Sequence, residues 1–410
     1  FMEGMQSAGV LANAKHFPGH GDTSSDSHKT LPIIDFSAKR IDSIELYPYK
    51  KLISKNLSSV MVAHLNVPNL DPRPNYPSSL SYPIVTDLLK EKLGFKGLIF
   101  TDALSMKGAS NFSNPGEIDL QAFLAGNDVM LMSNDVTQGI AALEKAVVSG
   151  LISEERLAHS VKKILKAKYK VGLHQFTPIE TTNLVADLNR QKDDVLYGEL
   201  MENAITLVQN KKNNLPLKNL ELHKVAYVKM GDADATPFVN SLNKYTKVDV
   251  VNSRNLDELM VSLKGYNTVI VGYHKSNANP WKPYRFTDKE LVWLYEISRK
   301  NNVILTVFAK PYALNDFKTV ENFESILMAY QNSPIAQQKA AQIIFGALPA
   351  QGVLPVSCGK NFNTGIGLQT TPINRLTHGL PESVGIDTKR LHKIDSIVNY
   401  AISEQMTPGI

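Results

Sequence analysis

The stretch that decides the fold is AKHFPGHGDTSSDSH, residues 14–28. A mostly apolar run, residues 8–14, leads into a Lys-His pair, a Pro-Gly-His-Gly turn and a polar loop. Loops supported by a rigid strand are where binding and catalytic groups concentrate. Three imidazoles, one ammonium and two carboxylates between Lys15 and His28 are a density that packing alone rarely requires. The alternative is a polar surface loop with a turn.

The first part of the chain alternates apolar runs with helix-like segments. Near-continuous apolar runs suit parallel strands buried on both faces, and helices between them suit right-handed βαβ units. Strand ends at His16, His64 and Asp102 match a (β/α)8 barrel, whose active site gathers at the C-terminal strand ends. Since only four strands are visible, we expect half of the barrel before Phe1. The strands are expected at residues 8–16, 60–64, 97–102 and 128–132, the helices at 44–57, 84–93 and 117–125, and two closing helices within 151–171.

The predicted fold class is α/β: the C-terminal half of a TIM-type (β/α)8 barrel, followed by a three-layer α/β/α sandwich. The sandwich should hold a mostly parallel sheet, with residues 352–356 as a final edge strand because proline is tolerated there. A loop at 279–284 could expose aromatic side chains. The predicted organisation is a partial barrel at 1–175, a linker at 176–190, the sandwich at 191–375, and a linker with the first helix of a further domain at 376–410.

The composition of the chain limits the kinds of partner and site that it can have. The 410 residues carry a net charge of +5 without a dense basic block, which argues against nucleic acid. Cys358 is the single cysteine, so an intrachain disulfide and a multi-cysteine metal site are excluded. No apolar run approaches the ~20 residues of a membrane helix, so we expect no integral membrane segment in this chain.

Asp102 and the Asp26–His28 pair are the candidate catalytic residues. At a barrel strand end, Asp102 could attack an electrophilic carbon and hold a covalent intermediate; the alternative is a helix N-cap for residues 103–106. In a turn, Asp26 could bond to His28, fix its tautomer and raise its basicity for proton transfer. The alternative there is an Asx-turn with a solvated histidine.

Candidate ligand-binding residues surround these groups. Lys15 and His16 alternate in direction along the strand, so one of them should face the barrel mouth and meet the hydroxyls of a polar ligand. His64 is equally compatible with ligand contact and with a structural role. A metal site remains an alternative, drawing on His16, His20, Asp22, Asp26 and His28.

Residues 14–22 and 26–28, with Leu31-Pro32, closely resemble the signature of bacterial β-N-acetylglucosaminidases of glycoside hydrolase family 3. FTDALSM, residues 100–106, resembles the nucleophile strand of that family. Many members that act on glucosides or xylosides lack the Asp-Ser-His loop. The resemblance extends to about residue 375, where the second unit looks like the C-terminal α/β sandwich of the family.

The resemblance implies a retaining exo-β-N-acetylglucosaminidase that acts on peptidoglycan or chitin-type saccharides. Asp102 would be the nucleophile, His28 the acid/base and Asp26 its partner, while Lys15, His16 and His64 would bind substrate. No metal or organic cofactor is implied, and phosphate could replace water as the acceptor. Alternatives are a metal-dependent barrel hydrolase and a non-catalytic sugar-binding module.

The C-terminal segment, residues 381–387 with the helix that follows, resembles the entry to a β-lactamase-like serine hydrolase domain. Such a domain is fused behind a family 3 unit in some envelope proteins. We therefore expect a fused serine hydrolase domain as a partner of this chain, and a bacterial envelope location, periplasmic or secreted, with a cytoplasmic location as the alternative.

Overall fold

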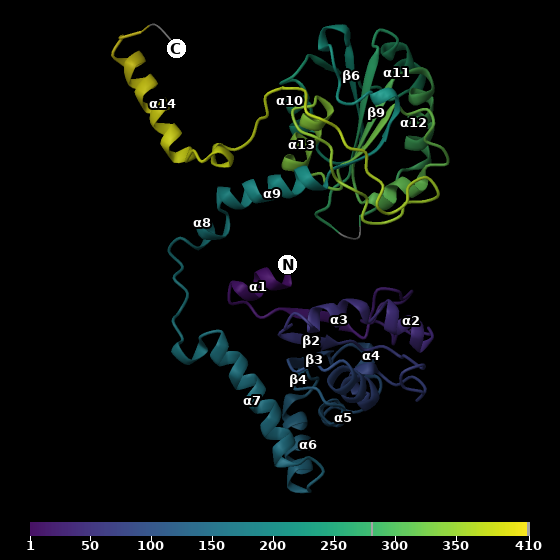
Figure 1. Cartoon of the computed structure of the whole chain (residues 1–410), viewed down its shortest axis with the longest axis vertical. Helices are drawn as coiled ribbons and strands as arrows, with labels where there is room; N and C mark the ends of the chain where they lie inside the picture. The colour runs from purple at the N-terminus through teal and green to yellow at the C-terminus, as the bar shows by residue number, and fades with distance from the viewer. Residues whose placement is uncertain (280–281, 408–410) are drawn as a thin grey trace. The chain divides into compact units, whose positions relative to one another are not determined.

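The computed structural model describes residues 1–279 and 282–407, which form two compact units, Phe1–Ile179 and Glu180–Ile410. Figure 1 shows a sheet with its helices in each unit. The loop at 279–284, predicted to expose aromatic side chains, includes residues 280 and 281, which lie outside the described residues; in its described part, Tyr284 is half-buried. Across the described ranges, no helix is both long and apolar enough to cross a bilayer.

The first unit is built on a four-stranded sheet, in which every neighbouring pair of strands is parallel. Residues such as Val60, Val62 and Ile99 are fully buried, which explains why the strands read as continuous apolar runs. The predicted α/β class with parallel strands is confirmed for this unit. In the order of the sheet, the strands are β1 (Asn13–Phe17), β2 (Ser59–Val62), β3 (Leu98–Ala103) and β4 (Val129–Leu131).

Helices connect these strands, and their bounds correct some expectations. The first apolar run is strand only from Asn13, because a turn with Gly9 at φ +82° separates β1 from helix α1. Residues 151–171 hold one long helix, capped by Ser153, rather than two. The helices are α1 (Met2–Ser7), α2 (Ala38–Ser43), α3 (Tyr47–Ile53), the π-helical segment η2 (Pro83–Lys92), α4 (Lys107–Ser110), α5 (Glu117–Ala125), α6 (Val136–Val148) and α7 (Glu154–Lys170).

The second unit has a six-stranded sheet in the order β5-β10-β9-β8-β6-β7, in which only β5 runs antiparallel to its neighbour. Alternate strand residues face opposite sides: Val269 and Val271 enter one apolar cluster, and Ile270 enters the other. The predicted mostly parallel sheet is confirmed. The strands are β5 (Thr206–Asn210), β6 (Val225–Gly231), β7 (Val248–Val250), β8 (Thr268–His274), β9 (Val303–Phe308) and β10 (Ser325–Met328).

Helices cover both faces of this sheet, which makes the three layers. Helices α11 (Leu256–Leu263) and α12 (Asp288–Lys300) pack on one face. Helices α9 (Gln191–Ala204), α10 (Thr236–Leu242) and α13 (Pro334–Ile344) pack on the other. Two further helices are α8 (Leu184–Leu188), in the stretch predicted as a linker, and α14 (Thr388–Ser403).

The predicted edge strand at 352–356 is wrong. These residues, all of them described, form no strand, and the six-stranded sheet ends at β5 on one side and at β7 on the other. Leu354 instead exchanges backbone hydrogen bonds with residues a short distance along the chain, accepting from Gly365 and donating to Ile366, both at 2.8 Å.

Candidate active site

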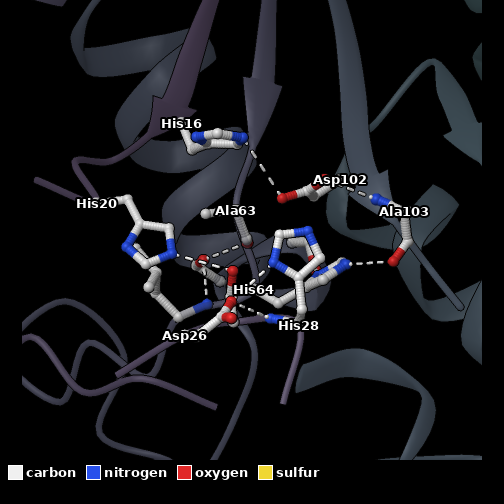
Figure 2. A network of polar contacts seen from close by, with 12 residues as sticks. His16, His20, Asp26, His28, Ala63, His64, Asp102 and Ala103 are labelled. Atoms are coloured by element: carbon white, nitrogen blue, oxygen red, sulfur yellow. Dashed lines mark hydrogen bonds and ion pairs between the residues drawn. The ribbon is translucent and has the colours of Figure 1, made fainter. Parts of the chain in front are cut away.

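The candidate site gathers at the C-terminal ends of β1, β2 and β3 (Figure 2). Asp102 belongs to β3, which continues to Ala103, and the next helix begins only at Lys107; the N-cap alternative for Asp102 is therefore wrong. One carboxylate oxygen, Oδ1, accepts a hydrogen bond from the Ala103 N–H at 2.9 Å. The other, Oδ2, lies 3.7 Å from His16 Nε2. The carboxylate is thus held by the backbone and presents one oxygen to the site.

His16 is the strand-end residue that faces Asp102. Its side chain is 28% exposed and that of Asp102 is 13% exposed. Burial lowers the pKa of His16, and the Asp102 carboxylate opposes that shift. The charges of Lys15, His20 and His28 also act on the His16 ring, so these groups share one electrostatic environment. A neutral imidazole beside a carboxylate is suited to hydrogen bonding with hydroxyl groups.

Asp26 and His28 form a hydrogen-bonded pair. Asp26 Oδ1 lies 2.7 Å from His28 Nδ1 and also accepts the backbone N–H of His28 at 2.9 Å. These bonds, led by the backbone one, lower the pKa of Asp26, so the carboxylate stays ionised. An ionised partner on Nδ1 makes that nitrogen the donor and leaves Nε2 to exchange protons. The His28 side chain is 75% exposed, within reach of a ligand from solvent.

Lys15 and His64 take different positions. Lys15 is exposed on β1 and lines a cavity of about 570 Å³ together with His16 and His20. His64 is fully buried, donates from Nε2 to the Ala103 carbonyl at 2.9 Å and lies 2.7 Å from Ser79 Oγ through Nδ1. Burial lowers its pKa. Since this ring has no exposed surface, the geometry corrects the expected substrate contact: His64 supports the backbone next to Asp102.

Residues that were considered as ligands of a metal ion form hydrogen bonds and ion pairs with other side chains. His20 bonds to Thr23 and Ser27, and Asp22 pairs with Arg40 at 2.6 Å. In the part of the chain that the structure describes, no three His, Cys, Asp or Glu side chains are grouped to hold a metal ion. The geometry does not support that alternative.

Two sets of contacts that hold the loop at residues 19–30 were not predicted from the sequence. The buried Glu45 carboxylate pairs with Arg40 at 3.0 Å, and Arg40 reaches Asp22 on the loop. On the other side, a Cβ added to Gly108 of α4 would lie 2.9 Å from the Thr30 carbonyl oxygen and 3.2 Å from that of Ser27. The Arg40–Asp22 bond joins residues 18 apart, and Gly108 meets the loop from a distant segment, so no local pattern predicts these two contacts.

Comparison with known proteins places these features in a family context. Residues 1–167 match the Glycosyl hydrolase family 3 N terminal domain. The chain is 32% identical over 237 residues to Beta-hexosaminidase A of Pseudoalteromonas piscicida, covering 53% of this chain and 39% of that protein. It is 42% identical over 144 residues to a Beta-hexosaminidase of Shewanella frigidimarina (strain NCIMB 400), covering 35% and 41%.

A solved structure extends the likeness. The glycoside hydrolase family 3 beta-N-acetylglucosaminidase from Paenibacillus sp. str. FPU-7 has a TM-score of 0.65 and 26% identity, covering 87% of this chain and 69% of that one. The chain spans 39% to 51% of the length of the first three curated relatives that it matches. The family match, the relatives and this structure together support glycosyl hydrolase family 3 as the family of the first unit.

Proposed function

We propose that this chain is part of a retaining β-N-acetylglucosaminidase that releases N-acetylglucosamine from saccharides. The observation that carries the proposal is the Asp102 carboxylate, held at the end of β3 beside His16, with the Asp26–His28 pair on the neighbouring loop. The names of the relatives, beta-hexosaminidase and beta-N-acetylglucosaminidase, support the sugar class.

In the first step, Asp102 Oδ2 attacks the anomeric carbon and the bond to the leaving oxygen breaks. His28, protonated on both nitrogens, gives its Nε2 proton to that oxygen, so the aglycone leaves as a neutral alcohol. The products are a glycosyl ester on Asp102 and a neutral His28.

In the second step, His28 Nε2 takes a proton from water while the water oxygen attacks the anomeric carbon. The bond to Asp102 breaks, the carboxylate is restored and His28 is protonated again. Two inversions at one carbon retain the configuration. Asp26, ionised and bonded to Nδ1, stabilises the imidazolium in both steps.

The remaining roles follow from position. His16, next to Asp102, and Lys15, exposed on the same strand, would bind hydroxyl groups of the sugar. The proposed reaction uses no metal or organic cofactor. Peptidoglycan or chitin-type fragments as substrates, an envelope location and a fused serine hydrolase domain are also part of the proposal. Substrate panels, cell fractionation and the sequence of the longest natural polypeptide that contains this chain test them in turn.

The experiment compares turnover of aryl β-N-acetylglucosaminides and β-glucosides by the longest natural polypeptide that contains this sequence. The proposal expects turnover of the acetamido sugars, the β-anomer as first product, and no loss on chelation. Loss on chelation with recovery on adding zinc would favour the metal-dependent hydrolase. Binding without turnover, unchanged in Asp102→Asn, would favour the sugar-binding module.

A further inference from the structure

The loop that carries His28 is braced from inside by an imidazole that the proposed reaction does not use. His20 Nδ1 lies 2.9 Å from Thr23 Oγ1, and His20 Nε2 lies 3.0 Å from Ser27 Oγ. Ser27 directly precedes His28 in the chain. One ring therefore ties the beginning of the loop to the residue next to the proposed acid.

Both ring nitrogens of His20 bond to hydroxyl groups, each of which can donate or accept. The Thr23 hydroxyl also lies within hydrogen-bond distance of the His20 carbonyl, at 3.2 Å. When Thr23 donates its single proton to that carbonyl, it accepts from Nδ1–H, and in a neutral ring Nε2 then accepts from the Ser27 hydroxyl. The other tautomer reverses both bonds, so the ring ties Thr23 to Ser27 in either case.

Burial and packing make this bond a constraint on His28. Ser27 is only 4% exposed, although the His28 side chain beside it is 75% exposed. The Ser27 carbonyl lies against Gly108 of α4, where an added Cβ would come within 3.2 Å. Ser27 is therefore held through its side chain by His20 and through its backbone by α4. Because His28 directly follows Ser27, its backbone position is constrained as well.

His20 also contacts the half of the site that holds the proposed nucleophile. Its ring meets the His16 ring edge to face, with centroids 5.9 Å apart and planes at 73°. His16 in turn faces Asp102. Figure 2 shows His16 facing Asp102, and the His20 and His28 rings in the same group of polar side chains.

We propose that His20 is a positioning residue for proton transfer: through Ser27 it sets the place of His28 relative to the leaving oxygen. This inference rests on the proposed function, since it presumes that His28 is the acid. A displacement of about 1 Å at a reacting group can cost about 100-fold in rate. Loss of His20 should therefore impair the protonation of poor leaving groups selectively.

The test measures kcat/KM, which reports the first bond cleavage, for phenyl and 2,4-dinitrophenyl β-N-acetylglucosaminides. Dinitrophenolate leaves without a proton, whereas phenolate requires one. The variants are His20→Ala, His20→Gln, His20→Asn, Ser27→Ala and His28→Ala, with Ser25→Ala as a matched control, because Ser25 is an exposed serine of the same loop.

The proposal expects His28→Ala to lose about 10² to 10⁴-fold on the phenyl substrate and little on the dinitrophenyl one. His20→Ala and Ser27→Ala should show the same pattern at about 10- to 100-fold. His20→Gln, whose amide oxygen can accept from Ser27, should recover more than His20→Asn, which reaches only Thr23. Ser25→Ala should match the wild type.

If His20→Ala and Ser27→Ala lost as much kcat/KM on the dinitrophenyl substrate as on the phenyl one, the positioning role would be overturned, even where His28→Ala loses kcat/KM on the phenyl substrate alone. If His28→Ala itself showed no dependence on the leaving group, the acid assignment and this inference would both fail. Thermal melting of each variant identifies misfolding. Should His20→Ala not fold, Ser27→Ala and His20→Gln decide the question.

Discussion

The contact between α4 and the loop that carries His28 gives a prediction whose size follows from the structure. In Gly108→Ala, the new Cβ would lie 2.9 Å from the Thr30 carbonyl oxygen and 3.2 Å from both the Ser27 oxygen and His64 Cβ. Two of these neighbours are backbone atoms, so the loop must move by roughly 0.5 Å to restore ordinary contact. Such overpacking typically costs about 1–3 kcal/mol, and alanine in a helix regains about 0.5–1 kcal/mol.

We therefore expect Gly108→Ala to lower the free energy of unfolding by up to about 2 kcal/mol. It should also reduce kcat/KM by roughly 10-fold or more, because the proposed acid is displaced. Urea unfolding and turnover of the phenyl substrate measure the two effects. The matched control is Gly4→Ala in α1, where an added Cβ meets nothing within 4 Å and stability should stay equal or rise. Full activity of Gly108→Ala would refute the reasoning that α4 fixes the loop.

The remaining predictions concern chemistry, ion pairs and pH. Asp102→Asn should lose at least about 10³-fold in turnover while its circular dichroism stays unchanged, and residual activity near the wild-type level would refute its role. Glu45→Gln removes the buried charge partner of Arg40 and should lower the free energy of unfolding by roughly 2–4 kcal/mol. Asp22→Asn removes the exposed partner of Arg40 and should cost under about 1 kcal/mol. Urea titrations that reverse this order would contradict the argument from burial. Burial lowers the pKa of His274 from 6.5 to about 4, so the unfolded chain takes up a proton that the folded chain refuses. Stability should thus be complete above about pH 6.5 and fall by about 3 kcal/mol as the pH drops to 4, and His274→Gln, compared in urea at both pH values, should flatten this decline. An unchanged decline in that variant would assign the acid sensitivity to other groups.

Local patterns predicted the strands and most helices, because a strand that is buried on both faces is a continuous run of apolar residues in the sequence. Helix α5 occupies residues 117–125 as expected, and Asp102 lies at the end of a buried strand. The hydrogen bond between Asp26 and His28 could also be expected, because it depends only on a turn of three residues. Their catalytic role stays a prediction.

Features that depend on distant packing could not be predicted in the same way. An apolar segment with a proline at 352–356 has the composition of an edge strand, but Leu354 forms its backbone hydrogen bonds with Gly365 and Ile366 instead of with a strand of the sheet. A histidine after a strand can face a ligand or the core, and His64 faces the core because Ser79 and Ala103 take both ring nitrogens. The roles of Gly108 and Ser27 depend on a contact between segments that only the fold brings together.

The central claim is that Asp102 forms a covalent bond to the sugar. The direct measurement incubates the longest natural polypeptide containing this sequence with a 2-acetamido-sugar inactivator that traps a glycosyl-enzyme, and then locates the label by peptide mass spectrometry. The account predicts a label on the peptide of β3, at Asp102, that is absent in Asp102→Asn. An active enzyme that carries its label elsewhere, or none at all, would contradict it.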